Sequence, residues 1–297
     1  MPDLERLHTV ASIIAIAAST GVAIPALTRL LEQASSLNGL RFGASIDWSS
    51  LTCSLPIDDS DDALMRALTG VLTQASCEEL TAFRNAFRNP PGIVEVTERA
   101  LADEVSAAAW VYVGVPVGDL PSLLASTDCP NAVGSALLDM AQAIGLERIT
   151  HLGVRVAPTG ICWGLQTHRV ADAEHLARQI GQVARGAVRW NVSERQRRWF
   201  TRSVLTFASD VGATTAQLFI DAQGEPEPLL FRLHGVDEAI VAQLVSQFGV
   251  EAGFRRLTSL VALAPSMSRF AFLDMSLSSS EPPGIAFTHD VALPLPR

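Results

Sequence analysis

Tight turns separate short stretches in which apolar and polar residues alternate, and this feature limits the possible folds more than any other. Alternation with a period of two predicts β-strands that each bury one face. We expect a strand at residues 108–116 and hairpins at 40–45 with 51–55, 149–156 with 161–167, 214–222 with 228–234, and 255–264 with 268–277. Strands joined by tight turns are antiparallel, which excludes a doubly wound parallel sheet.

Helical patterns lie between these hairpins. We expect helices near residues 60–75, 77–88, 133–145, 171–183 and 237–248, and one that begins at Ser193, where Gln196 completes a capping box. Hairpins that alternate with helices predict an α+β fold, a ten-stranded antiparallel β-barrel inside a ring of helices, because a closed barrel leaves no bare strand edge. No linker divides residues 1–297, so we expect a single domain with an irregular tail at 278–297.

The apolar run at residues 9–27 is typical of a buried helix. Acidic Asp3 and Glu5 precede it where a signal peptide has basic residues, and Ser, Thr, Gly and Pro dilute it below the hydrophobicity of a membrane span. We expect a break near Gly21 and Pro25 and a second helix at residues 26–33. These features predict a soluble, cytoplasmic protein, either a monomer or a homodimer.

Composition excludes several classes of partner. The chain is 48% hydrophobic and 18% charged, with a formal net charge of -9, which argues against nucleic acids and anionic membranes. All 22 basic residues are arginine, so no lysine can form a Schiff base or bind a phosphate. The four cysteines and six histidines show no zinc-site spacing, and we expect reduced, buried thiols, no metal and no cofactor. The sequence also lacks GxSxG, P-loop and GxGxxG motifs.

The faces of the strands indicate where a site would lie. If helices cover the apolar face of every strand, the mixed face lines the lumen, and a barrel of this size encloses a cavity. The residues expected in the lumen are Arg41, Ser45, Trp110, Tyr112, His151, Arg155, Thr215, Gln217, Phe219, Asp221 and Arg232. Two strands are ambiguous: either Cys162 or Trp163 faces inward, and Arg269, Asp274 or both do so.

Aromatic, basic and acidic side chains inside an apolar cavity are typical of a small-molecule pocket. In this interpretation His151 or Asp221 carries a proton, while Arg155 or Arg232 stabilises developing negative charge. The remaining candidates would bind the substrate. A solvated barrel rim accounts for His151 and Arg155 about as well as a site does.

The order of elements resembles that of the soluble ABBA-type aromatic prenyltransferases, which fold as a ten-stranded barrel ringed by helices. The stretches "AAAWVYVGVP", "GLERITHLGVRV", "GICWGLQ" and "FIDAQGEPEPLLFRL" carry the likeness, which covers nearly the whole chain. The resemblance implies a lumen that binds an allylic diphosphate and an aromatic acceptor.

The diphosphate-binding positions of that family are largely altered. The resemblance places the family's lysine of the central strand at Ala108 or Trp110, its asparagine at Cys162 and its arginine at Pro228. The magnesium-binding aspartate falls at Ser50, and a late lysine falls at Arg269, the single cation retained. Tyrosines that shield the allylic cation mostly become Gln217, Gly164 and Leu273.

Because a diphosphate without cations is costly in a low-dielectric barrel, the first hypothesis is diphosphate-independent chemistry. It is an enzyme of bacterial secondary metabolism that cyclises or rearranges an apolar aromatic or polyketide-like intermediate. The alternative is an aromatic prenyltransferase that binds a dimethylallyl or geranyl diphosphate through relocated arginines. A non-catalytic small-molecule binder is the third possibility.

Overall fold

The computed structural model describes most of the barrel and part of its helical ring. The described residues are 23–33, 40–45, 49–57, 62–88, 91–99, 104–170, 192–206, 213–235, 267–277 and 284–291, with scattered helical positions at 11–18, 178–186 and 239–258. All statements below refer to this part of the chain.

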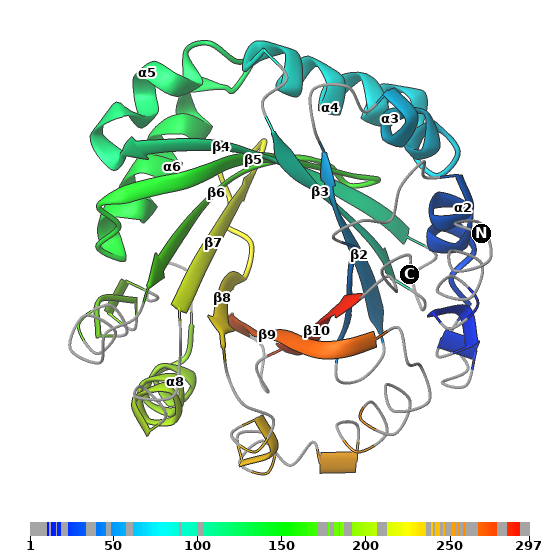
Figure 1. Ribbon diagram of the computed structural model, residues 1–297. Helices are drawn as coiled ribbons and strands as arrows, with labels where there is room; N and C mark the ends of the chain where they lie inside the picture. The colour runs from blue at the N-terminus through cyan, green and yellow to red at the C-terminus, as the bar shows by residue number, and fades with distance from the viewer. Residues whose placement is uncertain are drawn as a thin grey trace.

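The strands close into an antiparallel barrel, and the predicted fold class is confirmed (Figure 1). Round the barrel the order is β1-β10-β9-β8-β7-β6-β5-β4-β3-β2. The strands are β1 (Arg41–Ser45), β2 (Ser50–Ile57), β3 (Gly92–Arg99), β4 (Glu104–Pro116), β5 (Arg148–Ala157), β6 (Gly160–Val170), β7 (Ala213–Asp221), β8 (Leu229–His234), β9 (Met267–Leu277) and β10 (Gly284–Val291).

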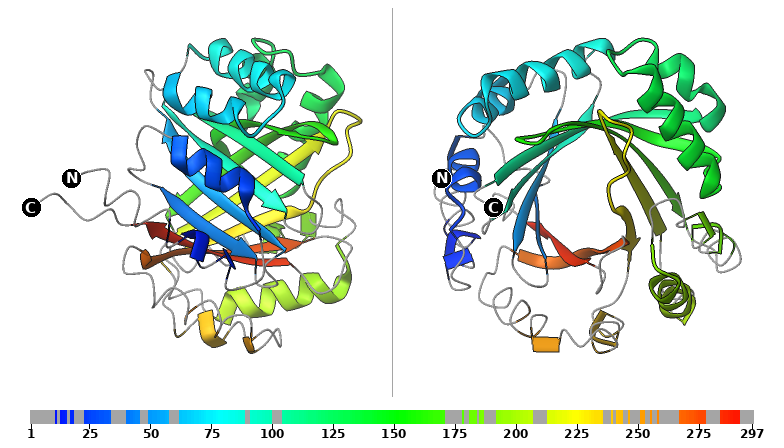
Figure 2. Two further views of the ribbon diagram at one scale, coloured as in Figure 1. Left: turned by 90° about the vertical axis from the view of Figure 1, so that its right-hand side faces the viewer. Right: turned by 180° about the vertical axis from the view of Figure 1, so that it is seen from behind.

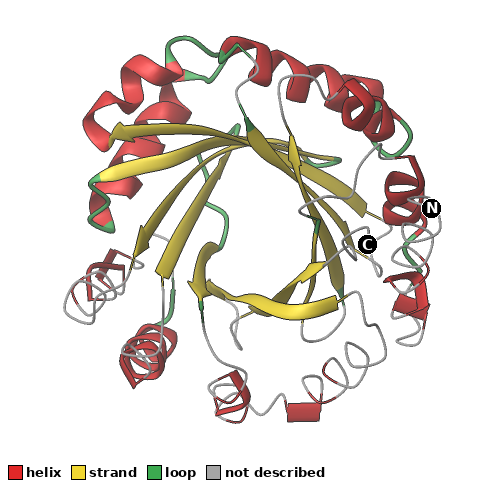
Figure 3. Cartoon of the chain, viewed as in Figure 1, coloured by secondary structure: helices red, strands yellow, loops and turns green. Residues whose placement is uncertain are grey.

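Helices surround the barrel on its outer side (Figure 3). They are α2 (Pro25–Gln33), α3 (Asp62–Thr69), α4 (Gln74–Ala86), the 3-10 turn η1 (Val117–Asp119), α5 (Leu120–Leu124), α6 (Asn131–Ala143) and α8 (Glu194–Thr206). Helix α2 packs on β3, α4 on β4 and β5, and α6 on β6 and β7. Figure 2 shows the strands running obliquely behind this ring. No helix in the described ranges is long and apolar enough to cross a membrane.

Most of the predicted elements are confirmed. The hairpins β1–β2, β5–β6 and β7–β8 pair as expected. The backbone N–H of Gln196 donates to Ser193 Oγ at 3.1 Å, which is half of the predicted capping box. The expected helices at 171–183 and 237–248 lie largely outside the described residues, although the described positions within them are helical.

Two predictions about strands are wrong, and one strand was missed. A strand was expected at 255–264, but Arg255 and Thr258, the described positions of that range, are helical, and β9 pairs with β8 and β10 instead. The tail predicted to be irregular contains β10, which closes the barrel against β1. Strand β3 was not predicted at all, although Val94 and Val96 alternate with polar residues. These errors share a cause: tertiary closure of the barrel supplies hydrogen-bonding partners that local composition does not reveal.

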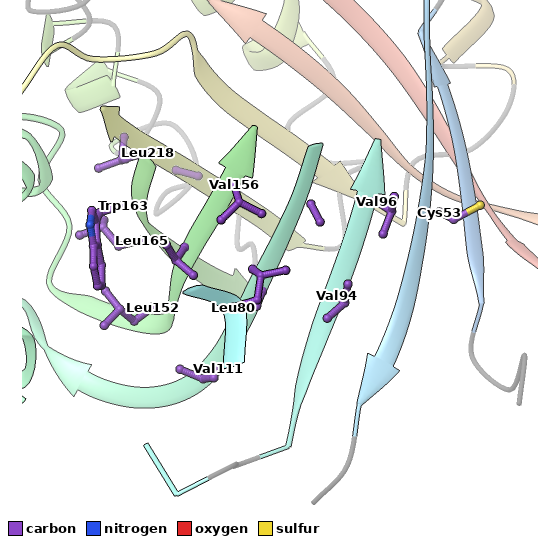
Figure 4. Close-up of a cluster of buried hydrophobic side chains, with 14 of the residues drawn as sticks. Cys53, Leu80, Val94, Val96, Val111, Leu152, Val156, Trp163, Leu165 and Leu218 are labelled. Atoms are coloured by element: carbon purple, nitrogen blue, oxygen red, sulfur yellow. The ribbon is translucent and has the colours of Figure 1, made fainter. Parts of the chain in front are cut away.

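The apolar faces of the strands pack outward against the helices. Phe42, Val94, Leu152 and many similar residues form one continuous buried core between barrel and ring, part of which appears in Figure 4. Trp163 belongs to this outer core, with its ring 5.8 Å from that of Phe83 on α4. The prediction of Trp163 as a substrate-binding residue is therefore wrong, because the parity of β6 turns Cys162 inward instead.

Two glycines make room for aromatic rings inside the barrel. A Cβ added at Gly153 on β5 would lie 2.4 Å from the ring of Trp110, which comes from the neighbouring strand β4. A Cβ added at Gly164 on β6 would lie 2.6 Å from the ring of Phe219 on β7. Both rings therefore lie against a wall that has no side chain at that point.

Glu98 fastens a helix to the barrel. Its side chain points outward from β3 and is only 4% exposed. The carboxylate accepts the backbone N–H groups of Leu27 at 2.9 Å and Ala26 at 3.3 Å, in the first turn of α2. Backbone donors in a first helical turn have no partner within the helix, so Glu98 acts as a cap from another element.

We predict that Gly153→Ala lowers the free energy of unfolding by roughly 1–3 kcal/mol, because the new methyl group overlaps the Trp110 ring. Urea denaturation measures the change. Gly118→Ala is the matched control, since a Cβ there meets nothing within 4 Å and the substitution should be close to neutral. Equal stability of the two variants would contradict the packing described here.

We also predict that Glu98→Ala destabilises the protein by roughly 1–3 kcal/mol, because two buried N–H groups of α2 lose their acceptor. Glu104→Ala removes a glutamate that pairs with Arg99 at the barrel rim, and should cost about 1 kcal/mol or less. Thermal denaturation of both variants compares the two positions. A Glu98 variant as stable as the Glu104 variant would show that α2 does not depend on this cap.

Candidate functional site

Solvent reaches the inside of the barrel. On β8, Leu229, Phe231 and Leu233 are completely buried under the helices, with Phe231 packed edge-on against Phe200 of α8. The residues between them point into the lumen and are partly exposed: Leu230, Arg232 and His234. Residues that face inward and are nevertheless accessible require an open lumen.

A charged cluster spans the lumen, and we call it the cross-lumen cluster: Glu95, Trp110, Arg232 and Asp274. Arg232 donates to both oxygens of Asp274 on the adjacent strand β9, at 2.7 and 3.0 Å. Its Nη1 lies 3.7 Å from Glu95 Oε1 on β3, which is on the opposite side of the barrel. The indole N–H of Trp110 donates to the other oxygen of Glu95 at 2.9 Å.

Burial and neighbouring charges act in opposite directions on the pKa values of Arg232 and Asp274. Burial by itself lowers the pKa of Arg232, but Asp274 and Glu95 outweigh that effect and the pKa is raised overall, so the guanidinium stays charged. Burial raises the pKa of Asp274, and Arg232 opposes that shift. Two carboxylates therefore already neutralise the one guanidinium of Arg232.

A second cluster lies where β5 meets β6 and β7 meets β8, and we call it the turn-end cluster: Arg155, Cys162, Phe219 and Glu227. Arg155 forms an ion pair with Glu227, and its guanidinium carbon lies 4.6 Å from the centre of the Phe219 ring. The Cys162 thiol lies 3.2 Å from Glu227 Oε1 and 3.5 Å from Arg155 Nη2. Burial lowers the pKa of Arg155 and raises that of Cys162, so the thiol is protonated and inert as a nucleophile.

Aromatic rings connect the two clusters. The Trp110 and Phe219 rings are 5.0 Å apart with a tilt of 55°. Together with Ala108 and Cys162 they form a buried apolar group inside the barrel, separate from the outer core. The lumen therefore combines an aromatic wall with a charged group at each end of it.

The other predicted lumen residues lie on the expected faces but mostly contact each other. At the helix-connected end of the barrel, Tyr112 is 62% exposed and its ring packs on His151. His151 Nδ1 lies 3.1 Å from the Thr150 hydroxyl. Further along the same side, the Thr215 hydroxyl bonds to His234 at 2.8 Å and Gln217 donates to Gln166 at 3.2 Å.

Asp221 and Ser45 shape turns. Asp221 Oδ1 accepts the backbone N–H groups of Gln223 and Glu225, at 2.9 and 2.8 Å. The Ser45 hydroxyl accepts the backbone N–H of Ser50 at 3.0 Å. The catalytic role expected for Asp221 has no geometric support, because its carboxylate holds the β7–β8 turn. Arg41 begins β1, partly exposed, and the side chain of Arg269 lies outside the described residues.

Sequence reasoning missed Glu95 and Glu227. Glu95 was overlooked together with β3, although the alternation at 93–98 was a usable signal. Glu227 lies in the turn "GEPEP", and nothing in that stretch indicates that its side chain turns back to an arginine on β5. Among the described residues no group of three or more His, Cys, Asp or Glu side chains could hold a metal ion, and all four cysteines are free.

Comparison with known proteins gives matches among solved structures alone. No family model and no curated protein matches the chain. Among solved structures, the prenyltransferase PriB in its apo form matches with a TM-score of 0.67 and 12% identity, over 99% of this chain and 98% of that one. PriB has also been solved as a ternary complex with L-tryptophan and dimethylallyl thiolodiphosphate, and that structure matches equally well.

Two further enzymes match in the same way. The 5-dimethylallyl tryptophan synthase from Streptomyces coelicolor has a TM-score of 0.64 and 10% identity, over 99% of this chain and 96% of that one. NotF in complex with brevianamide F has a TM-score of 0.65 and 10% identity, over 95% and 92%. Likeness at this level of identity concerns the fold, and the chain has the barrel fold of the ABBA-type aromatic prenyltransferases.

Proposed function

We propose that the protein is an enzyme that transfers an allylic group from its diphosphate to an aromatic acceptor bound in the lumen. The observation that carries this proposal is the likeness of nearly the whole chain to solved aromatic prenyltransferases, one of them bound to an aromatic amino acid and a diphosphate analogue. The sequence alone made prenyl transfer the alternative hypothesis and cyclisation the first. The comparisons favour prenyl transfer, and they offer no support for diphosphate-independent cyclisation.

The cross-lumen cluster suits an aromatic acceptor. Glu95 already accepts an indole N–H, that of Trp110, at 2.9 Å, so its carboxylate is oriented toward an aromatic donor in the lumen. Its other oxygen is 3.7 Å from Arg232, beyond the range of a strong hydrogen bond. Glu95 is therefore the lumen carboxylate best placed to receive a proton, whereas Asp274 has both oxygens engaged by Arg232.

In the proposed reaction the C–O bond of the allylic diphosphate breaks and its electron pair leaves with the diphosphate. A carbon or nitrogen of the acceptor forms the new bond to the allylic carbon, and the acceptor's displaced proton passes to Glu95. The faces of Trp110 and Phe219 would stabilise the allylic cation and exclude water from it. Arg155 is the lumen cation that would balance the departing diphosphate.

We predict that the protein, incubated with dimethylallyl diphosphate and L-tryptophan or a simple indole, gives a product heavier by one dimethylallyl group. Liquid chromatography with mass spectrometry detects it, and boiled protein is the control. If neither this donor nor geranyl diphosphate is consumed while indoles bind by calorimetry, prenyl transfer is wrong. Cyclisation and non-catalytic binding would then be the surviving hypotheses.

We predict that Glu95→Gln lowers kcat by about a hundredfold or more with little change in acceptor binding, because the proton acceptor is lost while the shape is kept. Glu104→Gln, at the barrel rim, is the control and should keep its activity. Steady-state kinetics and acceptor titration compare the variants. A Glu95 variant with unchanged kcat would remove Glu95 from the mechanism.

A further inference from the structure

The carboxylate of Glu227 lies between a guanidinium and a thiol of the barrel wall. Its Oε1 faces two groups at once, the guanidinium of Arg155 and the thiol of Cys162 at 3.2 Å. These groups come from facing positions on β5 and β6 and do not depend on the turn that carries Glu227. An oxygen of another anion could take the place of Oε1 without any movement of the barrel wall.

Only the side chain of Glu227 has to move for this exchange. Its backbone N–H donates to the carbonyl of Phe219 at 2.9 Å, and the preceding Pro226 forms a β-bridge with Ile220. The proline on each side further restricts the backbone. The Glu227 side chain is 27% exposed, against 9% for Asp274, so its carboxylate can turn toward solvent, where water hydrates it.

Arg155 and Arg232 differ in availability. Arg232 is 11% exposed and held by two carboxylates on separate strands, one of them in a two-oxygen contact. Arg155 is 21% exposed and pairs with a single carboxylate from a turn. Because the chain contains no lysine, arginine supplies the permanently charged donors for a phosphate or carboxylate bound in the lumen.

We propose that Arg155 and Cys162 form an anion subsite and that Glu227 is an internal anion which a ligand's phosphate or carboxylate displaces. The Glu227 side chain thereby competes with the ligand and sets its apparent affinity. The identification of the ligand as an allylic diphosphate rests on the proposed function, whereas the subsite itself does not.

The test compares two substitutions in one turn. Inorganic pyrophosphate is titrated into the wild type, Glu227→Gln and Glu225→Gln by calorimetry. Glu225 is exposed and lies two residues away, so its variant makes the same change in charge without the contact to Arg155. We expect Glu227→Gln to bind pyrophosphate about tenfold tighter or more, and Glu225→Gln to match the wild type. Malonate in a parallel titration distinguishes a phosphate subsite from a carboxylate subsite.

A double variant, Arg155→Met with Glu227→Gln, removes both charges together and should abolish the binding gained by Glu227→Gln. If Glu227→Gln does not fold, Glu227→Asp withdraws the carboxylate by one methylene and should give a smaller gain in the same direction. Equal pyrophosphate affinity of Glu227→Gln and Glu225→Gln, or binding that persists in the double variant, overturns the proposal. Tighter pyrophosphate binding by Glu227→Gln without any prenyl transfer would support the subsite and reject the proposed function. Prenyl transfer without tighter pyrophosphate binding would support the proposed function and reject the subsite.

Discussion

The burial of one apolar row from each of the strands β1 to β9 under the helices is the constraint on which the rest of the structure depends. Phe42, Val94, Leu152 and their equivalents lie in the outer core. Because successive side chains of a strand point to opposite faces, the residues that alternate with them face the lumen. Closure of the barrel then brings together residues from strands that are distant in the chain, such as Glu95 on β3 and Arg232 on β8. The contents of the lumen are thus a consequence of packing on the outside.

Charge pairing is the second consequence. An arginine in a partly dry lumen is stable only with a carboxylate beside it, because an unpaired buried charge costs several kcal/mol. Arg232 satisfies this requirement with two acids fixed on strands, and Arg155 satisfies it with one acid on a turn. The acids of the first arrangement are fixed on strands, and we propose that the acid of the second gives way to a ligand. Under the proposed function, this difference would reconcile paired cations with a diphosphate substrate.

Sequence patterns predicted the barrel and the facing of its strands, because a period of two assigns every residue to one side or the other. The same patterns placed Trp110, Arg155 and Phe219 correctly inside. They could not predict the partners of these residues. Glu95 reaches Arg232 only through closure of the barrel, and Glu227 reaches Arg155 only through the path of a turn. Packing decides which face of β6 points inward, because Trp163 fits beside Phe83 and Cys162 fits in the lumen.

The most direct test is a crystal structure with dimethylallyl thiolodiphosphate and an indole acceptor bound together. Our account predicts the thiolodiphosphate against Arg155, with the Glu227 carboxylate turned away, and the acceptor beside Glu95 with its ring near Trp110. Ligands bound outside the lumen, with the Arg155–Glu227 ion pair unchanged, would contradict it.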